Sequence, residues 1–342
     1  MSIHWPAEFE PQSSVLLTWP HTGTDWGQDF PSVEPVFRQL AALVTQQADL
    51  IVAAQDPERV DEQLAIAGVQ SERVHVVPCP SDDVWARDHG PITVFEGGTP
   101  LALDFQFDGW GGKFDASLDN RITQQLDEAG ALRPARRMNV DWTLEGGGIE
   151  TDGQGSLLGT EACLLDPRRN PGVERHALER QLHEWLGIQQ VLWLSSGHLE
   201  GDDTDSHIDT LARFVTPELI AYQACDDALD SHHSSLAAMR KQLQALRHRD
   251  GHGFELVPLP LPAPQVDASG RRLPAGYANF LILNESVLVP VYKTAADDVA
   301  LRRLDDAFAG RRIEPVDCRA LITQNGSLHC VTMNIPRMED CL

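Results

Sequence analysis

The chain has 342 residues, of which 42% are hydrophobic, and it carries a formal net charge of −24 at pH 7. This size and composition allow an ample core, fit one large or two ordinary globular domains, and exclude a disordered protein. The negative charge argues against nucleic acid or an anionic membrane surface as the partner and fits a small cationic ligand.

The first residues and the cysteines indicate the cellular compartment in which the protein is expected. The opening residues MSIHWPAEF contain no basic segment followed by an apolar core, and no run of about 18 apolar residues occurs, so we expect a cytoplasmic protein. The six cysteines include no CxxC pair, and we therefore expect free thiols, with neither a disulfide framework nor a structural zinc site. They are Cys79, Cys163, Cys225, Cys318, Cys330 and Cys341.

The first half of the chain alternates apolar strands with amphipathic helices. The patterns predict strands at 15–19, 50–54, 74–77, 92–95 and 101–107, and helices at 33–48, 57–69 and 116–129. Two motifs interrupt this order. They are DDVWARDHGPI at 82–92 and DGWGGKF at 108–114, whose three glycines predict unusual backbone angles or close approach of the backbone to a ligand.

The second half continues the alternation. A short strand ends at Glu145, before three glycines. Further strands are expected at 157–165, 191–194, 219–224, 254–259, 280–283 and 287–292, with helices at 173–186, 234–248 and 295–309. The segment 324–337 reads as a turn and a strand, with Cys330 near the beginning of the strand. Since no linker divides the sequence, residues 1–342 are expected to form one domain.

The stretch GHLEGDDTDSHIDT, residues 197–210, concentrates acids and histidines ahead of an apolar run. A helix would place His207 and Asp209 about 200° apart around its axis, whereas a strand puts side chains two apart on one face. We therefore expect a strand, with both side chains pointing the same way. Because isolated buried charges are strongly disfavoured, this stretch should enclose a positive charge.

The spacing of the polar motifs distinguishes between two α/β architectures. Asp88, Glu145 and His207 are separated by 57 and 62 residues, and Cys330 follows 123 residues later, about twice sixty. This rhythm predicts about five strand-strand-helix-strand units around an axis, with the polar loops gathered at one end. A doubly wound sheet is the alternative, but neither GxGxxG nor GxxxxGK(S/T) appears.

Most of the candidate residues also have an ordinary structural interpretation. A free cysteine is more often a buried small hydrophobe than a nucleophile, and we interpret Cys79 and Cys163 in that way. Asp88 and Glu145 could be turn or capping acids. Asp202, Asp203 and Asp205 could be solvated charges of a loop. Trp85 and Trp110 could be aromatic residues that only pack against their neighbours.

Taken together, these residues suit attack on a guanidinium carbon. Cys330 can supply a thiolate, and His207 beside Asp209 can donate and accept a proton. Because a guanidinium is planar and carries its donors in a fork, carboxylates on different sides can hold it over the sulfur. Trp85 and Trp110 would offer it a flat face if they line the cleft. This chemistry requires no metal and no cofactor.

Seven motifs between residues 5 and 336 carry a family resemblance: WPAEFEPQSSVLLTWP, WARDHGPI, FDGWGGKF, LEGGG, TEACLLDPRRNPG, GHLEGDDTDSHID and the terminal LHC. They resemble the agmatine deiminase family, which is related to the Porphyromonas-type peptidylarginine deiminases. The resemblance implies a pentein α/β-propeller with pseudo-fivefold symmetry and a homodimer. The chain departs from the family at Ser206, where TDGHID is usual, and at NGSLHC, which is poorer in glycine.

The resemblance also implies roles for individual residues. Cys330 would be the nucleophile, His207 the general acid and base, Asp88 and Asp209 the ligands of the guanidinium, and Glu145 a further acid of the site.

We therefore predict a deiminase that converts agmatine to N-carbamoylputrescine and ammonia through a covalent amidino-cysteine. Asp202 is expected to bind the second cation of agmatine, and the central stretch has no Lys or Arg to receive the carboxylate of arginine. Peptidyl-arginine or free arginine remains the alternative substrate. The rival classes are a metal-dependent hydrolase, with His198, Asp202, His207 and Asp209 as ligands, and a non-catalytic binder of cationic ligands.

Overall fold

The computed structural model describes residues 2–69 and 71–338, and within them the strands form five separate sheets. Two sheets have four strands, in the hydrogen-bonded orders β1 (Ile3–His4), β5 (Ile92–Glu96), β6 (Thr99–Gln106), β7 (Arg136–Thr143) and β17 (Thr332–Pro336), β2 (Gln12–Thr18), β3 (Asp49–Ala54), β4 (Val74–Pro78). Two of the three-stranded sheets have the orders β10 (Gln190–Leu194), β9 (Ser156–Thr160), β8 (Ile149–Thr151) and β11 (Ala212–Thr216), β12 (Leu219–Gln223), β13 (Glu255–Leu259). The last sheet has the order β14 (Leu281–Ile282), β15 (Ser286–Val291), β16 (Arg312–Asp317).

One ββαβ unit recurs in all five of these sheets. Each contains an antiparallel pair followed, after a helix, by a parallel strand. The connecting helices are α1 (Glu34–Val44), α5 (Ile122–Glu128), α7 (Arg175–Leu186), α8 (His233–Ala245) and α9 (Asp297–Ala307). The unit confirms an α/β fold and, among the described residues, replaces the single doubly wound sheet considered above.

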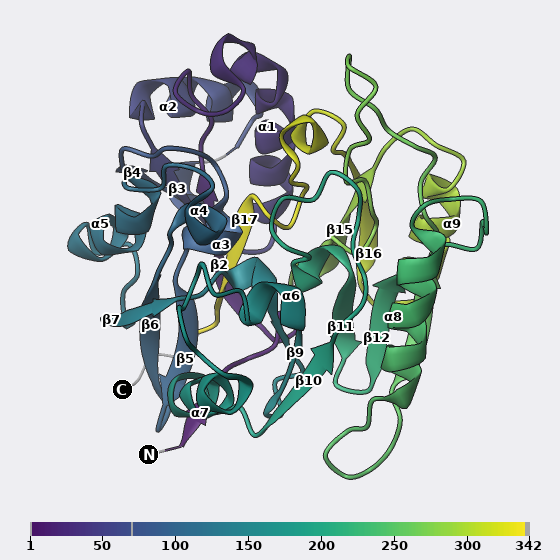
Figure 1. Cartoon of the computed structure of the whole chain (residues 1–342). Helices are drawn as coiled ribbons and strands as arrows, with labels where there is room; N and C mark the ends of the chain where they lie inside the picture. The colour runs from purple at the N-terminus through teal and green to yellow at the C-terminus, as the bar shows by residue number, and fades with distance from the viewer. Residues whose placement is uncertain (1, 70, 339–342) are drawn as a thin grey trace.

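The two ends of the chain meet in one sheet. Strand β17, yellow in Figure 1, pairs antiparallel with β2, drawn in purple, in a register that places Thr332 opposite Leu17. The pairing completes a unit that the first residues cannot build alone. It also sets Cys330, two residues before β17, among loops that lie much earlier in the sequence.

The longer helices pack around the outside of the molecule (Figure 1). Helix α1 shows why: it buries Phe37, Leu40, Ala41 and Val44, which recur at the spacing of one helix face. Strand β3 between its neighbours is buried along LIVAA, as its continuous apolar run predicts. Helix α2 (Pro57–Ile66) also lies at the periphery, whereas the short helices α3 (Ala86–His89), α4 (Gly109–Gly112) and α6 (Glu161–Leu164) lie toward the middle of the view.

Two of the predicted strands are wrong in part. The expected strand at 157–165 ends as β9 at Thr160, whose hydroxyl accepts a hydrogen bond from the Cys163 N–H and starts α6. The stretch around His207 is not a strand, because residues Ile208–Thr210 form a single turn of 3-10 helix before β11. The strands β1, β8 and β16 were not predicted, since they are very short or carry alternating charges and a proline.

The cysteines agree with the expectation of free thiols as far as the structure describes them. Cys79, Cys163, Cys225, Cys318 and Cys330 are all free and buried. Cys341 lies outside the described residues. No helix within the described part of the chain is both long and apolar enough to cross a membrane.

Candidate active site

Five buried side chains from four separate segments of the chain form the centre of the site. Asp88 belongs to α3, Glu145 immediately precedes the 3-10 turn Gly146–Gly148, His207 and Asp209 belong to the turn after β10, and Cys330 precedes β17. The least enclosed of them, Cys330, is only 6% exposed. The fold therefore assembles the residues that the sequence predicted.

The thiol of Cys330 lies beside an amide and a carboxylate. Its Sγ is 3.5 Å from Asn279 Oδ1 and 3.8 Å from Asp209 Oδ2. The other oxygen of Asp209, Oδ1, is buried and has no hydrogen-bond partner among the described residues. A buried carboxylate oxygen without a donor is costly, so its position indicates a cationic ligand. Asn279 was not predicted, because no motif marks it.

Asp88 is held in place by two donors. Its Oδ1 accepts a hydrogen bond of 3.0 Å from the Gly147 N–H, and its Oδ2 accepts one of 2.9 Å from Trp110 Nε1. Burial is the main reason that the pKa of Asp88 is raised to about 6. This carboxylate is therefore ionised at neutral pH but becomes protonated in mildly acidic solution.

His207 lies between two acids. Its Nδ1 is 3.6 Å from Asp88 Oδ1, and its Nε2 is 3.6 Å from Glu145 Oε2. Burial alone would favour the neutral ring, but Asp88, Cys163 and Glu145 outweigh burial and raise the pKa of His207 well above its ordinary value. The neighbouring acids therefore favour the imidazolium form of the ring, which can donate a proton.

Glu145 is itself fixed by Arg169, which the sequence did not single out. Arg169 Nε lies 2.8 Å from both carboxylate oxygens, and both side chains are almost fully buried. Cys163 also adjoins this pair, with its Sγ 3.9 Å from Glu145 Oε2. The interpretation of Cys163 as an ordinary core residue is thus incomplete, because this buried thiol borders the site.

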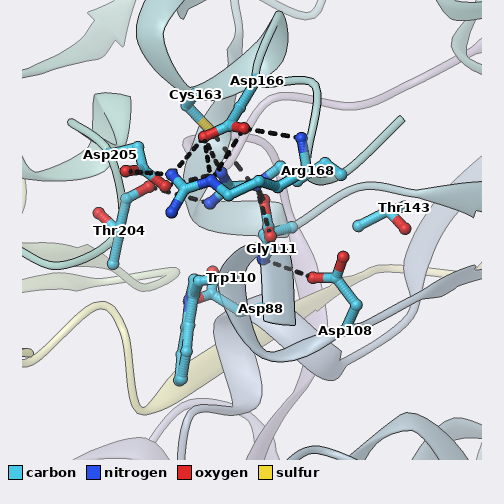
Figure 2. Close-up of polar contacts among 12 residues, drawn as sticks. Asp88, Asp108, Trp110, Gly111, Thr143, Cys163, Asp166, Arg168, Thr204 and Asp205 are labelled. Carbon is cyan, nitrogen blue, oxygen red and sulfur yellow. Dashed lines mark hydrogen bonds and ion pairs between the residues drawn. The ribbon is translucent and has the colours of Figure 1, made fainter. Parts of the chain in front are cut away.

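A left-handed turn carries Trp110 to the site. The four successive residues Gly109–Gly112 all have positive φ, with values of 72°, 60°, 80° and 75°, as the glycines of DGWGGKF predicted. For Trp110 this conformation costs about 1–2 kcal/mol, which the hydrogen bond from its indole to Asp88 helps to offset. The Asp108 carboxylate accepts from the Gly111 N–H and closes the turn (Figure 2).

A cluster of ion pairs lies beside this turn. Asp205 binds Lys113, Arg168 and Arg169, each at 2.8 Å, and Figure 2 shows Arg168 between Asp166 and Asp205. Asp205 is therefore a structural ion-pair residue and not a solvated loop charge. The next residue, Ser206, has a φ of 66°, which explains why glycine suits this position.

The cleft above Cys330 is lined by both predicted tryptophans and by three acids, one of which is Asp88. Trp85, Trp110, Asp25 and Asp203 all contribute to it. Asp202, which was expected to bind the tail of the substrate, is not among the lining residues. Its carboxylate accepts hydrogen bonds from Thr204 and Ser206 and stabilises the loop, while the neighbouring Asp203 faces the cleft.

The metal ligands expected for the rival hydrolase do not come together. His198 contacts Ser235 through Nδ1, and Asp202 is occupied in its loop. Within residues 2–69 and 71–338, the one group with suitable ligand atoms is Glu145, Cys163 and His207. Arg169 already supplies a positive charge to that glutamate, so a divalent cation would meet like charge there.

Comparison with known proteins gives a full-length match. The model of the Porphyromonas-type peptidyl-arginine deiminase family matches residues 4–336. A Vibrio parahaemolyticus protein, provisionally named an agmatine deiminase, is 33% identical over 98% of this chain and 97% of its own length. Residues of this chain also align with a solved structure assigned provisionally as an arginine deiminase of Porphyromonas gingivalis, at 44% identity and a TM-score of 0.92, with 98% of each chain covered.

Two further structures indicate the activity and the wider fold of similar proteins. A C. jejuni agmatine deiminase solved with substrate bound has a TM-score of 0.91 and 34% identity, covering 98% of this chain and 97% of that one. A citrulline complex of DDAH from Pseudomonas aeruginosa has a TM-score of 0.51 at 12% identity, over 95% of this chain and all of the other, a likeness of fold alone.

Proposed function

The chain belongs to the Porphyromonas-type peptidyl-arginine deiminase family, and we propose that it is an agmatine deiminase, hydrolysing agmatine to N-carbamoylputrescine and ammonia. The observation that carries this proposal is a buried thiol beside a buried carboxylate: Cys330 Sγ lies 3.8 Å from Asp209 Oδ2, and the other oxygen, Oδ1, has no hydrogen-bond partner among the described residues. A planar cation that fits between acids and a sulfur is a guanidinium.

Binding of the guanidinium would rest on Asp88 and Asp209. Among the residues that the structure describes, Asp209 Oδ1 has no partner, while Asp88 is oriented by Gly147 and Trp110. Carboxylates on separate loops can each accept N–H donors from the planar cation and hold its carbon over Cys330. The closed, dry surroundings strengthen these contacts because less water competes for them.

The substrate would also prepare the nucleophile. Burial and the neighbouring charges of Asp209 and Asp88 raise the pKa of Cys330 well above its ordinary value, so the thiol keeps its proton in the empty site. A bound guanidinium would compensate the two carboxylates and favour the thiolate, whose proton would pass through the cleft to solvent. The chemistry would then start only when substrate is present.

The reaction would proceed in two halves. The thiolate of Cys330 adds to the guanidinium carbon, and the tetrahedral adduct collapses when His207 gives its proton to a departing nitrogen, which leaves as ammonia. Water then attacks the S-amidino carbon and loses a proton to the neutral His207. When the C–S bond breaks, the ureido product and the Cys330 thiolate are released. Glu145 would keep His207 in position.

The acidic mouth favours agmatine over arginine. Asp203 is held by Asn325 Nδ2 at 2.9 Å, and both Asp203 and Asp25 line the cleft. Burial raises the pKa of each carboxyl, because it disfavours the charged form. A bound cation would stabilise the ionised carboxylates. The primary ammonium of agmatine would meet these acids, whereas the carboxylate of free arginine would be repelled. We therefore propose Asp203, in place of Asp202, as the ligand of the substrate tail.

The finer architecture follows from the same reasoning. Five ββαβ units, one of them completed where β17 pairs with β2 from the other end of the chain, support the pseudo-fivefold propeller implied by the resemblance. We further propose one catalytic domain, a cytoplasmic location, a homodimer, and a reaction that needs neither metal nor cofactor. The net charge of −24 supports a small cationic substrate and not nucleic acid.

The test compares three substrates and looks for the intermediate. Purified protein treated with EDTA is incubated with agmatine, arginine and an arginyl peptide, and the ureido product is measured. We expect turnover of agmatine. Acid quenching followed by mass spectrometry should reveal an amidino increment on the peptide that contains Cys330. Turnover of arginine or the arginyl peptide alone would refute the choice of substrate, and loss of activity with EDTA would favour the metal-dependent class.

A further inference from the structure

His329, the residue before the proposed nucleophile, is enclosed between two carboxylates. Its Nδ1 lies 2.8 Å from Asp209 Oδ2, and its Nε2 lies 2.8 Å from Glu8 Oε2. All three side chains are buried, and Glu8 comes from the other end of the chain, 321 residues away. The fold thus links the guanidinium ligand Asp209, through one imidazole, to a second acid that does not belong to the cleft.

The geometry fixes the protonation of this imidazole. An ionised carboxylate offers only acceptors, and a neutral imidazole has one donor and one acceptor nitrogen. Two hydrogen bonds of 2.8 Å to Asp209 and Glu8 therefore require an N–H on both nitrogens of His329, as long as both acids are ionised. His329 is then an imidazolium at the centre of a carboxylate-imidazolium-carboxylate chain.

Glu8 is well supplied with donors and stays ionised. It accepts from Arg87 Nη2 at 3.0 Å and from the Ile282 N–H at 2.8 Å, and its Oε1 lies 3.0 Å from Arg213 Nη2. Burial would raise its pKa, but Arg213, His329 and Arg87 together lower it well below its ordinary value. Arg213 also forms an ion pair with Glu150. Besides His329, the charged side chains next to Glu8 are therefore Arg87, Arg213 and, through Arg213, Glu150.

Asp209 depends on His329 for its charge. Burial alone would raise the pKa of Asp209, yet the hydrogen bond and the positive charge of His329 lower it, with smaller help from His207 and Arg213. The same bond occupies Oδ2 and leaves Oδ1 as the free acceptor. Cys330 Sγ lies 3.8 Å from the same Oδ2, so His329 is the group that stabilises the charged carboxylate beside the thiol.

We propose that His329 and Glu8 form a positioning pair that keeps Asp209 ionised and its Oδ1 directed at the guanidinium of the substrate. The pair does not touch the reacting atoms. This proposal rests on the proposed deiminase function for its kinetic consequence, but the double protonation of His329 is a property of the substrate-free protein.

The test uses two neutral replacements and one matched control. His329→Asn can still place an amide donor near Asp209 but cannot reach Glu8, whereas Glu8→Gln keeps the shape of the acid and removes its charge. The control is His232→Asn, because His232 is equally buried and bonds Asp230 at 2.8 Å, well outside this cluster. Each variant is assayed for kcat and KM with agmatine between pH 5 and 9 and for thermal unfolding.

We expect both variants to have a higher KM for agmatine and a pH profile of kcat/KM that is shifted to higher pH. In His329→Asn and in Glu8→Gln, Asp209 should hold its proton to higher pH, so the KM for agmatine should rise at least about tenfold at pH 7, the loss of one charge-assisted contact. In the wild type Asp88 sets the acid limb of kcat/KM near pH 6, and in these variants the protonation of Asp209 should become limiting and move that limb to higher pH by one unit or more. If the role of the pair is merely structural, the variants will have a lower unfolding temperature and a smaller active fraction. Their KM and the acid limb of kcat/KM will then match those of the wild type and of His232→Asn. That result would overturn the proposal.

A second measurement is independent of catalysis. In protein labelled with ¹⁵N-histidine and without substrate, the signals absent from His329→Asn belong to His329 and should show two protonated nitrogens at pH 8. A neutral ring there overturns the inference even if agmatine is turned over. If the ring is doubly protonated while the wild-type protein does not act on agmatine, the positioning pair stands and the proposed function falls.

Discussion

Gly147 occupies the narrowest point between three side chains of the site, and Gly147→Ala therefore tests the proposed geometry directly. A Cβ at this position would lie 2.6 Å from His207 Nδ1, 2.8 Å from Asp88 Oδ1 and 3.2 Å from Asp209 Oδ2. Ordinary van der Waals contact begins near 3.4 Å, so His207 would have to move by about 0.8 Å. Displacements near 1 Å cost about 100-fold in rate.

The neighbouring glycine provides the matched control. A Cβ on Gly148 would meet Cys163 Sγ at 3.0 Å but would stay 3.8 Å from the His207 ring. Both substitutions add one methyl group to the same 3-10 turn, and overpacking of this kind costs about 1–3 kcal/mol. The two variants should therefore lose similar amounts of stability and very different amounts of activity.

The assay measures ureido product from agmatine, alongside thermal unfolding of each variant. We expect kcat/KM to fall about 100-fold in Gly147→Ala and no more than a few-fold in Gly148→Ala. Wild-type activity in Gly147→Ala, or equal losses in both variants, would refute the assignment of His207, Asp88 and Asp209 as the groups that contact substrate.

Three further predictions follow from the site. Cys330→Ser should reduce kcat by ~10³-fold or more and abolish the covalent adduct in mass spectra, whereas Cys225→Ser, outside the site, should keep both. Asp203→Asn should raise the KM for agmatine about tenfold, the value of one contact to a charged group, but leave butylguanidine, which has no ammonium, unaffected; equal effects on both would remove Asp203 from the tail site. Since burial raises the pKa of Asp88 to about 6, kcat/KM should be constant above that pH and fall as Asp88 is protonated below it; a flat profile down to pH 5 would contradict the role of Asp88.

Local sequence, together with the family resemblance, was enough to indicate the candidate groups of the site. Asp88, Glu145, His207, Asp209 and Cys330 stand in short motifs whose turn residues and charges are legible along the chain, and their spacing indicated a repeated α/β unit. The buried strands and amphipathic helices were also predictable, because their apolar periodicity is a local property. The alternating rule failed at Asp209, where a single 3-10 turn replaced the expected strand.

Only the tertiary structure could supply the partners of these groups. Arg169 reaches Glu145 across 24 residues, Asn279 reaches Cys330 across 51, and Glu8 reaches His329 across 321. The sequence likewise could not show that Asp203, and not Asp202, lines the cleft, since adjacent carboxylates differ only in the direction that the loop gives them. Charge state depends on such spatial neighbours and on burial, whereas sequence determines only which groups are available.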